Sequence, residues 1–283
     1  MTVRLTLLGT GVFVDDEGRR NTSYMIDNGK TTAQVDCGAN VPDSFCKLYG
    51  REKFLTRPDA ILLTHTHWDH AGGVSGEELA IINELRPAAK RRKLIVAGEQ
   101  TAIENLGSRV QADYDFLPQY GEGYLDVERI PLKPTDEEAF RRLALKLGFK
   151  NIEAAETDHS APNLAYFFDC GNYSFGIGGD GRLRDGTKKL YGGRVKFLAY
   201  EAFHFGESTR THQGIEELVD FCISAGIPHV ALVHMDNPAR KTTSEIAYHS
   251  QRARERGVNV YVPNDHDSFE ISPGGVVYMA RNP

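Results

Sequence analysis

Short apolar stretches rich in β-branched and aromatic residues recur along the whole chain, and this pattern predicts strands. They lie at residues 3–8, 23–26, 32–36, 60–64, 93–97, 125–130, 164–169, 173–177, 195–200, 229–233, 259–262, 268–271 and 276–279. Helix-like stretches lie between groups of these strands and not between every pair. This order predicts an α/β protein whose sheets are covered by helices on their outer faces.

Four stretches carry the spacing or the end signals of helices. They are residues 76–85, a stretch that begins at Thr135, residues 212–225 and residues 242–256. An acidic turn follows Thr135, which suits the positive end of a helix dipole. The apolar residues of 212–225 share one helical face. Residues 107–124, rich in Tyr and Gly, fit neither pattern, and we expect a loop over a site or a subunit contact there.

The composition favours a globular protein without a membrane segment. Of 283 residues, 40% are hydrophobic, which is enough to bury one core, and we expect residues 1–283 to form a single domain. No stretch approaches the ~20 apolar residues of a membrane span, and the N-terminus lacks the features of a signal peptide. A net charge of −6 argues against stable nucleic-acid binding, which usually needs a basic face.

The cysteines are scattered and form no Cys-x-x-Cys pair. They are Cys37, Cys46, Cys170 and Cys222. We interpret them as reduced thiols, which predicts a reducing compartment and therefore the cytoplasm.

One segment carries most of the chemistry, because the apolar stretch 60–64 runs directly into four potential metal ligands. These are the histidines and the aspartate of His65-Thr66-His67-Trp68-Asp69-His70. His65 and His67, two positions apart at a strand end, can project in the same direction and chelate one ion. Asp69 and His70 can face a second ion. Imidazole and carboxylate suit zinc, with manganese or iron(II) as alternatives.

This motif resembles that of the metallo-β-lactamase superfamily. Leu8-Gly9-Thr10-Gly11 is similar to the opening turn of that family, and Val35-Asp36-Cys37-Gly38 is similar to its second-strand motif. The resemblance implies a four-layer αβ/βα sandwich with the metals held between the sheet edges. It also implies that Asp36 supports the metal site from behind.

The resemblance extends to three ligands that lie later in the chain. His159 matches the third metal motif, Asp180 matches the bridging carboxylate, and His234 matches the last ligand. It implies two divalent ions per chain, the first on His65, His67 and His159, the second on Asp69, His70 and His234, with Asp180 between them. His266 is the alternative to His234 and is otherwise a candidate substrate contact.

The second half resembles ribonuclease Z. His159-Ser160-Ala161-Pro162, Glu201-Ala202-Phe203 and Thr211-His212-Gln213 at a helix start are similar to motifs of that branch. The resemblance implies that His212 bonds the phosphate and protonates the leaving oxygen, with His204 as an alternative acid. The candidate catalytic residues are His212 and, among the metal ligands, Asp69.

One departure from ribonuclease Z narrows the expected substrate. That enzyme inserts a tRNA-clamping arm between its third metal motif and its bridging aspartate. Here His159 and Asp180 are only 180 − 159 = 21 positions apart, and two predicted strands fill the interval. Relatives without the arm include phosphodiesterases that act on small cyclic phosphates and cyclic nucleotides.

We therefore expect a homodimeric, two-metal phosphodiesterase of a small phosphodiester or cyclic nucleotide. A water between the two ions would attack phosphorus. Hydrolysis of a lactone, thioester or β-lactam is the alternative reaction, and tRNA 3′ processing is the alternative substrate. A metal-bearing binding protein without turnover is the non-enzymatic alternative, although the full ligand set argues against it.

Overall fold

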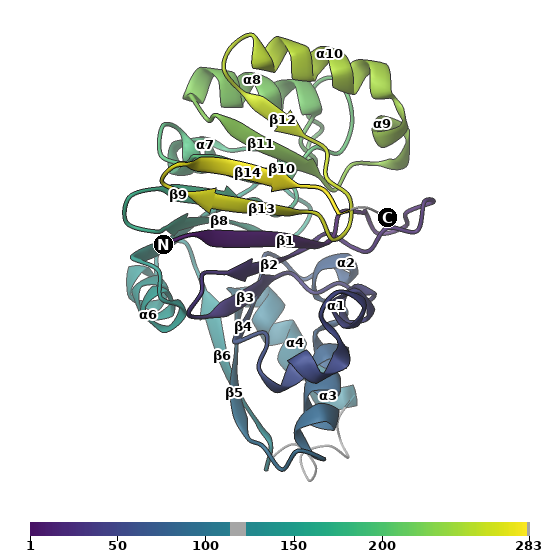
Figure 1. Ribbon diagram of the computed structural model, residues 1–283, viewed down its shortest axis with the longest axis vertical. Coiled ribbons are helices and arrows are strands. Elements are labelled where there is room, and N and C mark those ends of the chain that lie inside the picture. Colours follow the sequence, from purple (N-terminus) through teal and green to yellow (C-terminus); the bar gives the residue numbers. More distant parts are fainter. Residues whose placement is uncertain (114–122, 282–283) are drawn as a thin grey trace.

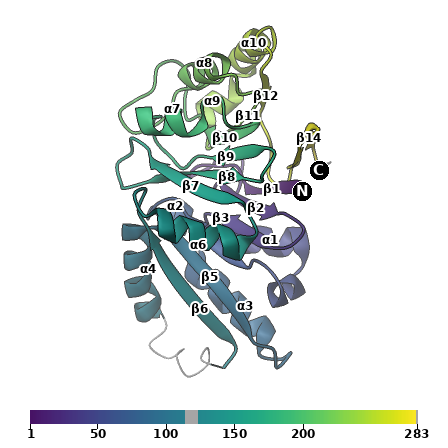
Figure 2. The same ribbon diagram turned by 90° about the vertical axis from the view of Figure 1, so that its left-hand side faces the viewer.

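The computed structural model describes residues 1–113 and 123–281. Within these residues, two β-sheets pack face to face, and helices cover the outer face of each sheet (Figures 1 and 2). The expected order of layers, helices, sheet, sheet and helices, is confirmed.

The first sheet is built mainly from the N-terminal half of the chain. In spatial order its described strands are β14 (Gly275–Met279), β13 (Ser268–Ser272), β1 (Val3–Gly9), β2 (Ser23–Asp27), β3 (Thr32–Val35), β4 (Ala60–Leu63), β5 (Arg92–Glu99) and β6 (Leu125–Leu132). The C-terminal hairpin β13–β14 therefore extends this sheet beside β1. Strands β3 to β6 run parallel to one another, so their carboxyl ends lie at one edge.

The second sheet comes from the C-terminal half. Its described strands are, in spatial order, β12 (Asn259–Tyr261), β11 (His229–Val233), β10 (Phe197–Glu201), β9 (Ser174–Ile177), β8 (Leu164–Asp169) and β7 (Asn151–Glu156). Strands β9 to β12 are parallel, so this sheet also gathers strand ends at one edge.

The helices fall into groups that cover different faces. They are α1 (Val41–Tyr49), the 3₁₀ helix η1 (Arg51–Leu55), α2 (Trp68–Ala71), α3 (Val74–Leu85), α4 (Gln100–Asp113), α6 (Glu137–Leu147), α7 (Asp185–Tyr191), α8 (Ile215–Ala225), α9 (Asn237–Lys241) and α10 (Thr243–Arg254). Helices α1, α3 and α4 lie against the first sheet, and α7, α8 and α10 lie against the second (Figures 1 and 2).

A layer of apolar side chains between the sheets holds them together. Val3, Leu5 and Leu7 of β1 are fully buried in this layer. Phe168 and Phe175 stack within it, with ring centroids 4.8 Å apart. Burial of such large side chains is the main favourable term in folding, at roughly 25 cal/mol per Å² of apolar surface. The layer therefore fixes the distance between the edges that carry the site.

Most of the predicted elements are present, and the differences have physical reasons. Strand β7 was not expected, because Asn151–Glu156 has Ile152 as its one large apolar residue and lies at a sheet edge. The prediction that a helix begins at residue 212 is wrong, since α8 begins at Ile215 after an extended Gly214. Of the stretch 107–124, residues 107–113 end α4, and 114–122 lie outside the described residues.

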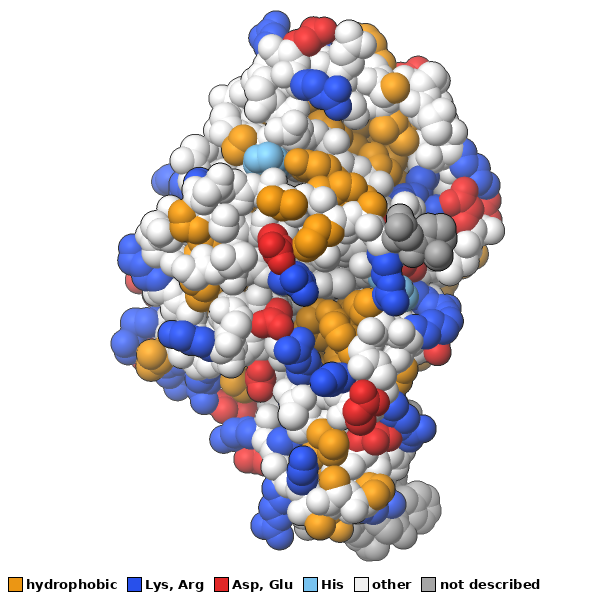
Figure 3. All heavy atoms as spheres, viewed as in Figure 1, with side chains coloured by type: hydrophobic (Ala, Val, Ile, Leu, Met, Phe, Trp, Pro, Cys, Tyr) orange, Lys and Arg blue, Asp and Glu red, His pale blue; other side chains and the backbone are white. Residues whose placement is uncertain are grey.

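The surface mixes charges of both signs. On the face shown in Figure 3, basic and acidic side chains are interspersed with apolar patches. Among the described helices, none combines the length and the apolar character that crossing a membrane requires. All four cysteines are free thiols, and Cys37 and Cys222 are buried.

Beneath the first sheet, α3 buries the carboxyl group of Glu77. Its Oε2 accepts hydrogen bonds from Gln34 Nε2 and from the Cys37 thiol, both at 2.9 Å. Burial raises the pKa of Glu77 from 4.5 to about 6. Because the fold favours the protonated form, the stability that this group contributes is present below pH 4.5 and is lost as the pH rises through about 6.

We therefore expect Glu77→Gln, which stays neutral, to become more stable relative to the wild type as the pH rises. The gain in free energy of unfolding between about pH 4 and about pH 8 should be about 2 kcal/mol. Urea unfolding at both pH values measures it. Glu216→Gln, at an exposed position of α8, is the control and should show no such change. If the difference in free energy of unfolding between Glu77→Gln and the wild type did not change with pH, burial would not be destabilising the ionised form of Glu77.

Candidate metal centre

The parallel strands deliver polar residues to the facing edges of the two sheets. In the first sheet, Asp36 follows β3 and His65 lies two positions after β4 ends. In the second sheet, Glu201 ends β10 and His234 follows β11, which pairs in register with it. Asp180 lies just beyond β9. Since carboxyl ends of parallel strands share one edge, these side chains converge although they are far apart in the sequence.

A first cluster contains His65, His67, His159 and Asp180. One ligand atom of each lies within 4.8 Å of those of the others. His159 Nε2 is 3.1 Å from His67 Nδ1, and His65 Nε2 is 4.0 Å from Asp180 Oδ2. The structure thus brings together the four residues that the sequence assigns to one ion and its bridge.

A second cluster contains Asp69, His70, His234 and Asp180, again within 4.8 Å. His234 Nε2 lies 3.3 Å from Asp69 Oδ2 and 3.5 Å from Asp180 Oδ2. His70 Nε2 lies 3.2 Å from Asp180 Oδ1. Asp180 therefore belongs to both clusters, as a bridging carboxylate must.

The chemistry of both clusters fits divalent cations. Within the described residues, His65 Nε2 is buried without a hydrogen-bond partner, and burial lowers the pKa of His65 well below its usual value. That imidazole is therefore neutral and has a lone pair to donate. Although burial opposes it, the carboxylates of Asp180 and Asp36 raise the pKa of His70 well above its usual value. The same negative field attracts a bound cation.

Asp36 and Thr64 orient the imidazoles from behind. Asp36 Oδ2 accepts a hydrogen bond from His70 Nδ1 at 2.8 Å, which turns Nε2 of that ring toward the cluster. Asp36 Oδ1 accepts from Thr64 N at 2.8 Å. Thr64 Oγ1 is 3.0 Å from His65 Nδ1. Such partners fix ring orientation and tautomer, and they increase the basicity of the ligands.

A close backbone contact holds α2, which carries Asp69, against the end of β3. A Cβ on Gly38 would lie 2.1 Å from the carbonyl oxygen of Asp69, so only glycine fits there. The segment Val35-Asp36-Cys37-Gly38 therefore combines a supporting carboxylate with the space that the ligand segment needs.

His159 is oriented by a loop from the second sheet. Its Nδ1 donates to Thr211 O at 2.8 Å, so Nε2 faces the first cluster. The carbonyl oxygen of Asp180 accepts from Thr157 Oγ1 at 2.6 Å and from Asn163 Nδ2 at 2.7 Å. The loop of the third metal motif and the bridging aspartate therefore position each other.

His212 lies beside the clusters in the loop that precedes α8. Its Nδ1 donates to Glu201 Oε1 at 2.5 Å, and its ring stacks on Phe203 with centroids 4.1 Å apart. Burial lowers its pKa, but the hydrogen bond and charge of Glu201 outweigh burial and raise it. The Nε2 atom of a protonated His212 is therefore free to donate a proton.

Glu201 connects His212 with the second cluster. Its Oε2 accepts from Gly181 N and Gln213 N, and its Oε1 lies 3.4 Å from His234 Nδ1. Asp180, Glu201 and His212 also have ligand atoms within 4.8 Å of one another. The two bonds to backbone amides and the bond to His212 occupy the Glu201 carboxylate, which favours a supporting role over metal ligation.

Neither alternative histidine reaches the clusters. His266 Nε2 lies 2.8 Å from Ser44 Oγ, beneath the first sheet. His204 Nε2 donates to Glu207 O at 3.0 Å.

The opening turn of the chain supports His234. The backbone N–H of His234 donates to Thr10 O. Asp265 Oδ1 in turn accepts hydrogen bonds from the backbone N–H and the hydroxyl of Thr10. Thr64 and Asp265 are supporting residues that sequence reasoning missed, although Thr10 lies in the opening turn that it identified.

A cavity of about 490 Å³ reaches both clusters. It is lined by residues from seven segments of the chain: Val12, Phe13, Val14, His67, Trp68, Asp69, His159, Ser160, Asp180, Phe203, His212 and His234. This volume is within the range of small-molecule sites. The candidate acid and both clusters therefore face one space that a small ligand can enter.

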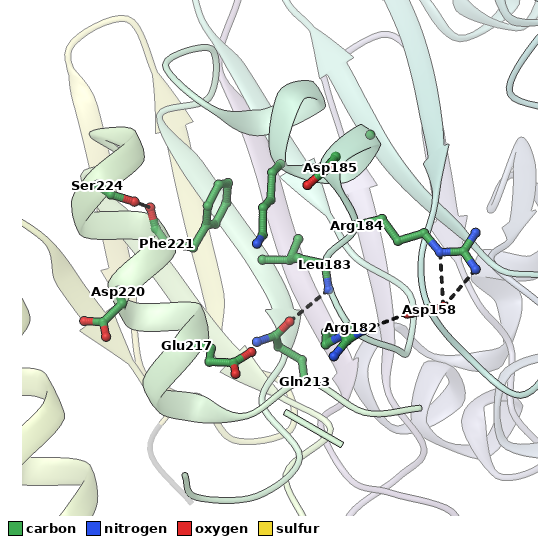
Figure 4. Close-up of a pocket in the computed structure, with 12 residues that line it drawn as sticks. Asp158, Arg182, Leu183, Arg184, Asp185, Gln213, Glu217, Asp220, Phe221 and Ser224 are labelled. Carbon is green, nitrogen blue, oxygen red and sulfur yellow. Dashed lines mark hydrogen bonds and ion pairs between the residues drawn. The ribbon is translucent and has the colours of Figure 1, made fainter. Parts of the chain in front are cut away.

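A larger cavity of about 1050 Å³ lies beside the loops and is lined by no residue of either cluster (Figure 4). On its wall, Arg182 and Arg184 bind Asp158, the residue before His159. Gln213, the residue after His212, accepts from Leu183 N at 2.9 Å. These contacts hold the loops of the metal centre in place from the outside.

The sequence is similar to one described family over most of its length. The family described as anti-Pycsar protein Apyc1 matches residues 3–222. A protein of that description from Bacillus phage BSP38 is 30% identical over 123 residues, which are 41% of this chain and 45% of that protein. The chain thus spans less than half of the length of this curated relative.

Solved structures of the same fold superpose over nearly the whole chain. The metallo-β-lactamase fold protein YhfI from Bacillus subtilis has a TM-score of 0.69 at 16% identity, covering 95% of this chain and 100% of its own. The short form of human tRNase Z has a TM-score of 0.68 at 16% identity, covering 94% and 98%. The expected metallo-β-lactamase sandwich is therefore confirmed.

The geometry predicts different metal contents for two histidine variants. We expect His234→Ala to lose about one ion per chain, because its imidazole faces Asp69 and Asp180. His266→Ala is the matched control and should keep the wild-type content. Elemental analysis of the purified proteins by mass spectrometry measures both. Loss of metal in His266→Ala with retention in His234→Ala would reverse the assignment.

Proposed function

Because the chain belongs to the anti-Pycsar protein Apyc1 family, we propose that it is a metal-dependent phosphodiesterase that hydrolyses a cyclic nucleotide or another small phosphodiester. The observation that carries the proposal is the position of His212, a raised-pKa imidazole that shares a cavity with two potential metal clusters.

We assign two divalent ions to the centre. Zinc is the expected metal, and manganese and iron(II) are the alternatives. The residues that would hold them are His65, His67 and His159 for one ion, Asp69, His70 and His234 for the other, and Asp180 for both. When bound, such ions neutralise the phosphoryl oxygens and make a water acidic enough to react near neutral pH.

Two side chains of the cavity would then accept and donate the protons of the reaction. Asp69 lines the cavity and is proposed to accept the proton of the attacking water. His212 would give its Nε2 proton to the leaving alkoxide, while Glu201 holds Nδ1 and stabilises the protonated ring. Phe203 keeps the His212 ring in one plane by stacking on it.

A small substrate agrees with the size of the cavity and with the short connection between His159 and Asp180. Strands β8 and β9 occupy that connection, so the interval contains no inserted arm. The net charge of −6 also disfavours a large polyanionic partner. We further propose, on family resemblance and on the free cysteines, a cytoplasmic homodimer whose residues 1–283 act as one domain.

A substrate screen with purified, metal-replete protein tests the proposed function. We expect hydrolysis of 3′,5′-cyclic nucleotides or other small diesters, and little trimming of a tRNA precursor. A lactone, a thioester and a β-lactam complete the panel. Trimming of a tRNA 3′ trailer as fast as diester cleavage would indicate a processing endonuclease. Faster cleavage of a lactone or thioester than of any diester would indicate the alternative hydrolase.

The role of His212 predicts a dependence on the leaving group. We expect His212→Ala to keep its metal and to lower kcat for an alkyl diester by ~10²-fold or more, because an alkoxide needs a proton to depart. The loss should be small for nitrophenolate. His204→Ala, in the same loop, is the control. Loss of metal in His212→Ala would make His212 a ligand, and a loss confined to His204→Ala would make His204 the acid.

A further inference from the structure

Exposed apolar side chains gather at the cavity that the two clusters share. Among the described residues, seven large hydrophobic side chains are exposed, and three of them, Phe13, Val14 and Trp68, line this cavity. Their exposed fractions are 60%, 68% and 53%. Exposed apolar groups concentrated at one place commonly mark a binding surface.

Trp68 is held in place by a close contact between its indole and the backbone of Gly72. It is the first residue of α2, between His67 and Asp69. A Cβ on Gly72 would lie 2.6 Å from Cδ2 and 2.9 Å from Cε2 of the indole. These two atoms are shared by both rings, so the backbone of Gly72 lies against the face of the indole. The side chain is 53% exposed and lines the cavity.

Phe13 is held by its loop and not by burial. Asn237 Nδ2 of α9 donates to Val14 O at 3.1 Å, and Asn237 Oδ1 accepts from Asp16 N at 3.3 Å. Arg19 Nε donates to Asp15 Oδ2 at 2.9 Å within the loop. A side chain that stays exposed on a tethered loop is positioned to contact a ligand at low entropic cost.

We propose that Trp68 and Phe13 form a stacking subsite for the planar aromatic base of the substrate, whose phosphodiester lies at the metal centre. This inference rests on the proposed function and specifies it. The cavity is lined by buried imidazole and carboxylate groups and by exposed apolar and aromatic side chains. A nucleotide has the matching pair of features, a charged phosphate and a flat ring with two π-faces. Aromatic side chains stack on every base, so the subsite favours a base without selecting one.

Kinetics with a matched pair of substrates test the subsite. The pair is a 3′,5′-cyclic nucleotide and methyl riboside 3′,5′-cyclic phosphate, which has the same reacting group and no base. We expect kcat/KM of the wild type to be about tenfold or more higher for the nucleotide. Trp68→Ala should remove most of this difference, because it should lower kcat/KM for the nucleotide by about tenfold more than for the base-less diester. Trp68→Phe should restore it.

Two further variants compare an aromatic ring that lines the cavity with one that lies outside it. Phe13→Ala should lower kcat/KM for the nucleotide through KM. Tyr248→Ala removes an exposed aromatic ring of α10 that does not line the cavity, and it is the control. Equal loss for both substrates in Trp68→Ala would mean that Trp68 supports the metal centre instead.

The composition offers a direct binding assay, since Trp68 is the only tryptophan of the chain. We expect adenosine 5′-monophosphate to quench the intrinsic fluorescence of the metal-loaded protein saturably, and ribose 5-phosphate to leave it unchanged. Quenching by both compounds, or by neither, would overturn the subsite.

The failures of the two proposals are distinguishable. If neither cyclic diester is cleaved, the proposed function fails. If both are cleaved with equal kcat/KM, the phosphodiesterase stands and the base subsite is wrong.

Discussion

Buried negative charge is the constraint on which this architecture depends. Asp36, Asp69, Asp180 and Glu201 lie with little exposure at the facing edges of the two sheets, within reach of a group of imidazoles. Removing such charges from water costs several kcal/mol each unless opposite charge and hydrogen bonds compensate. Hydrogen-bond donors surround Asp36 and Glu201, whereas Asp180 mainly faces imidazoles. A cation held at Asp180 would therefore offset the cost of burying its charge.

The two sheets supply this arrangement cooperatively. Each contributes parallel strands whose ends meet at the site, and hydrogen bonds join the sheets there. Tyr166 Oη of β8 donates to Leu63 O of β4 at 2.7 Å, and Leu164 N donates to Thr64 O at 3.0 Å. The ligand-bearing segments of the first sheet are thus fixed to the strand that follows His159. Movement of one sheet against the other would separate the ligands of a single cluster.

The sequence predicts the site better than the connections around it. The segment from His65 to His70 is a local signal, because its spacing alone places four ligands after one strand. His159, Asp180 and His234 depend on resemblance, since no local rule relates residues on different strands. The sequence left His266 as an alternative to His234, because both histidines follow predicted strands. In the structure His234 faces Asp69 and Asp180, whereas His266 contacts Ser44.

In the fold, too, local sequence patterns were predicted correctly and features that depend on tertiary contacts were not. Strands with continuous apolar runs were predicted, whereas the edge strand β7 was not, since its partly polar pattern is stabilised by pairing with β8. The start of α8 depends on the conformation of Gly214, which the helical spacing of later residues does not report. Likewise, the close contact between Trp68 and Gly72, four residues later, requires the absence of a Cβ at Gly72, which the helical pattern does not report.

The backbone at two of these positions bears on how such a protein evolves. His234 and Asp36 have φ values of 49° and 59°, a left-handed conformation that costs a non-glycine residue of order 1–3 kcal/mol. Replacement of His234 by glycine or asparagine would relieve that cost and remove an imidazole that faces Asp69 and Asp180. At Asp36 the relief would be offset, because Thr64 and His70 would lose their hydrogen bonds to its carboxylate. Persistence of His234 in a sequence is then a sign of selection for the proposed metal centre, which a buried hydrophobic core does not provide.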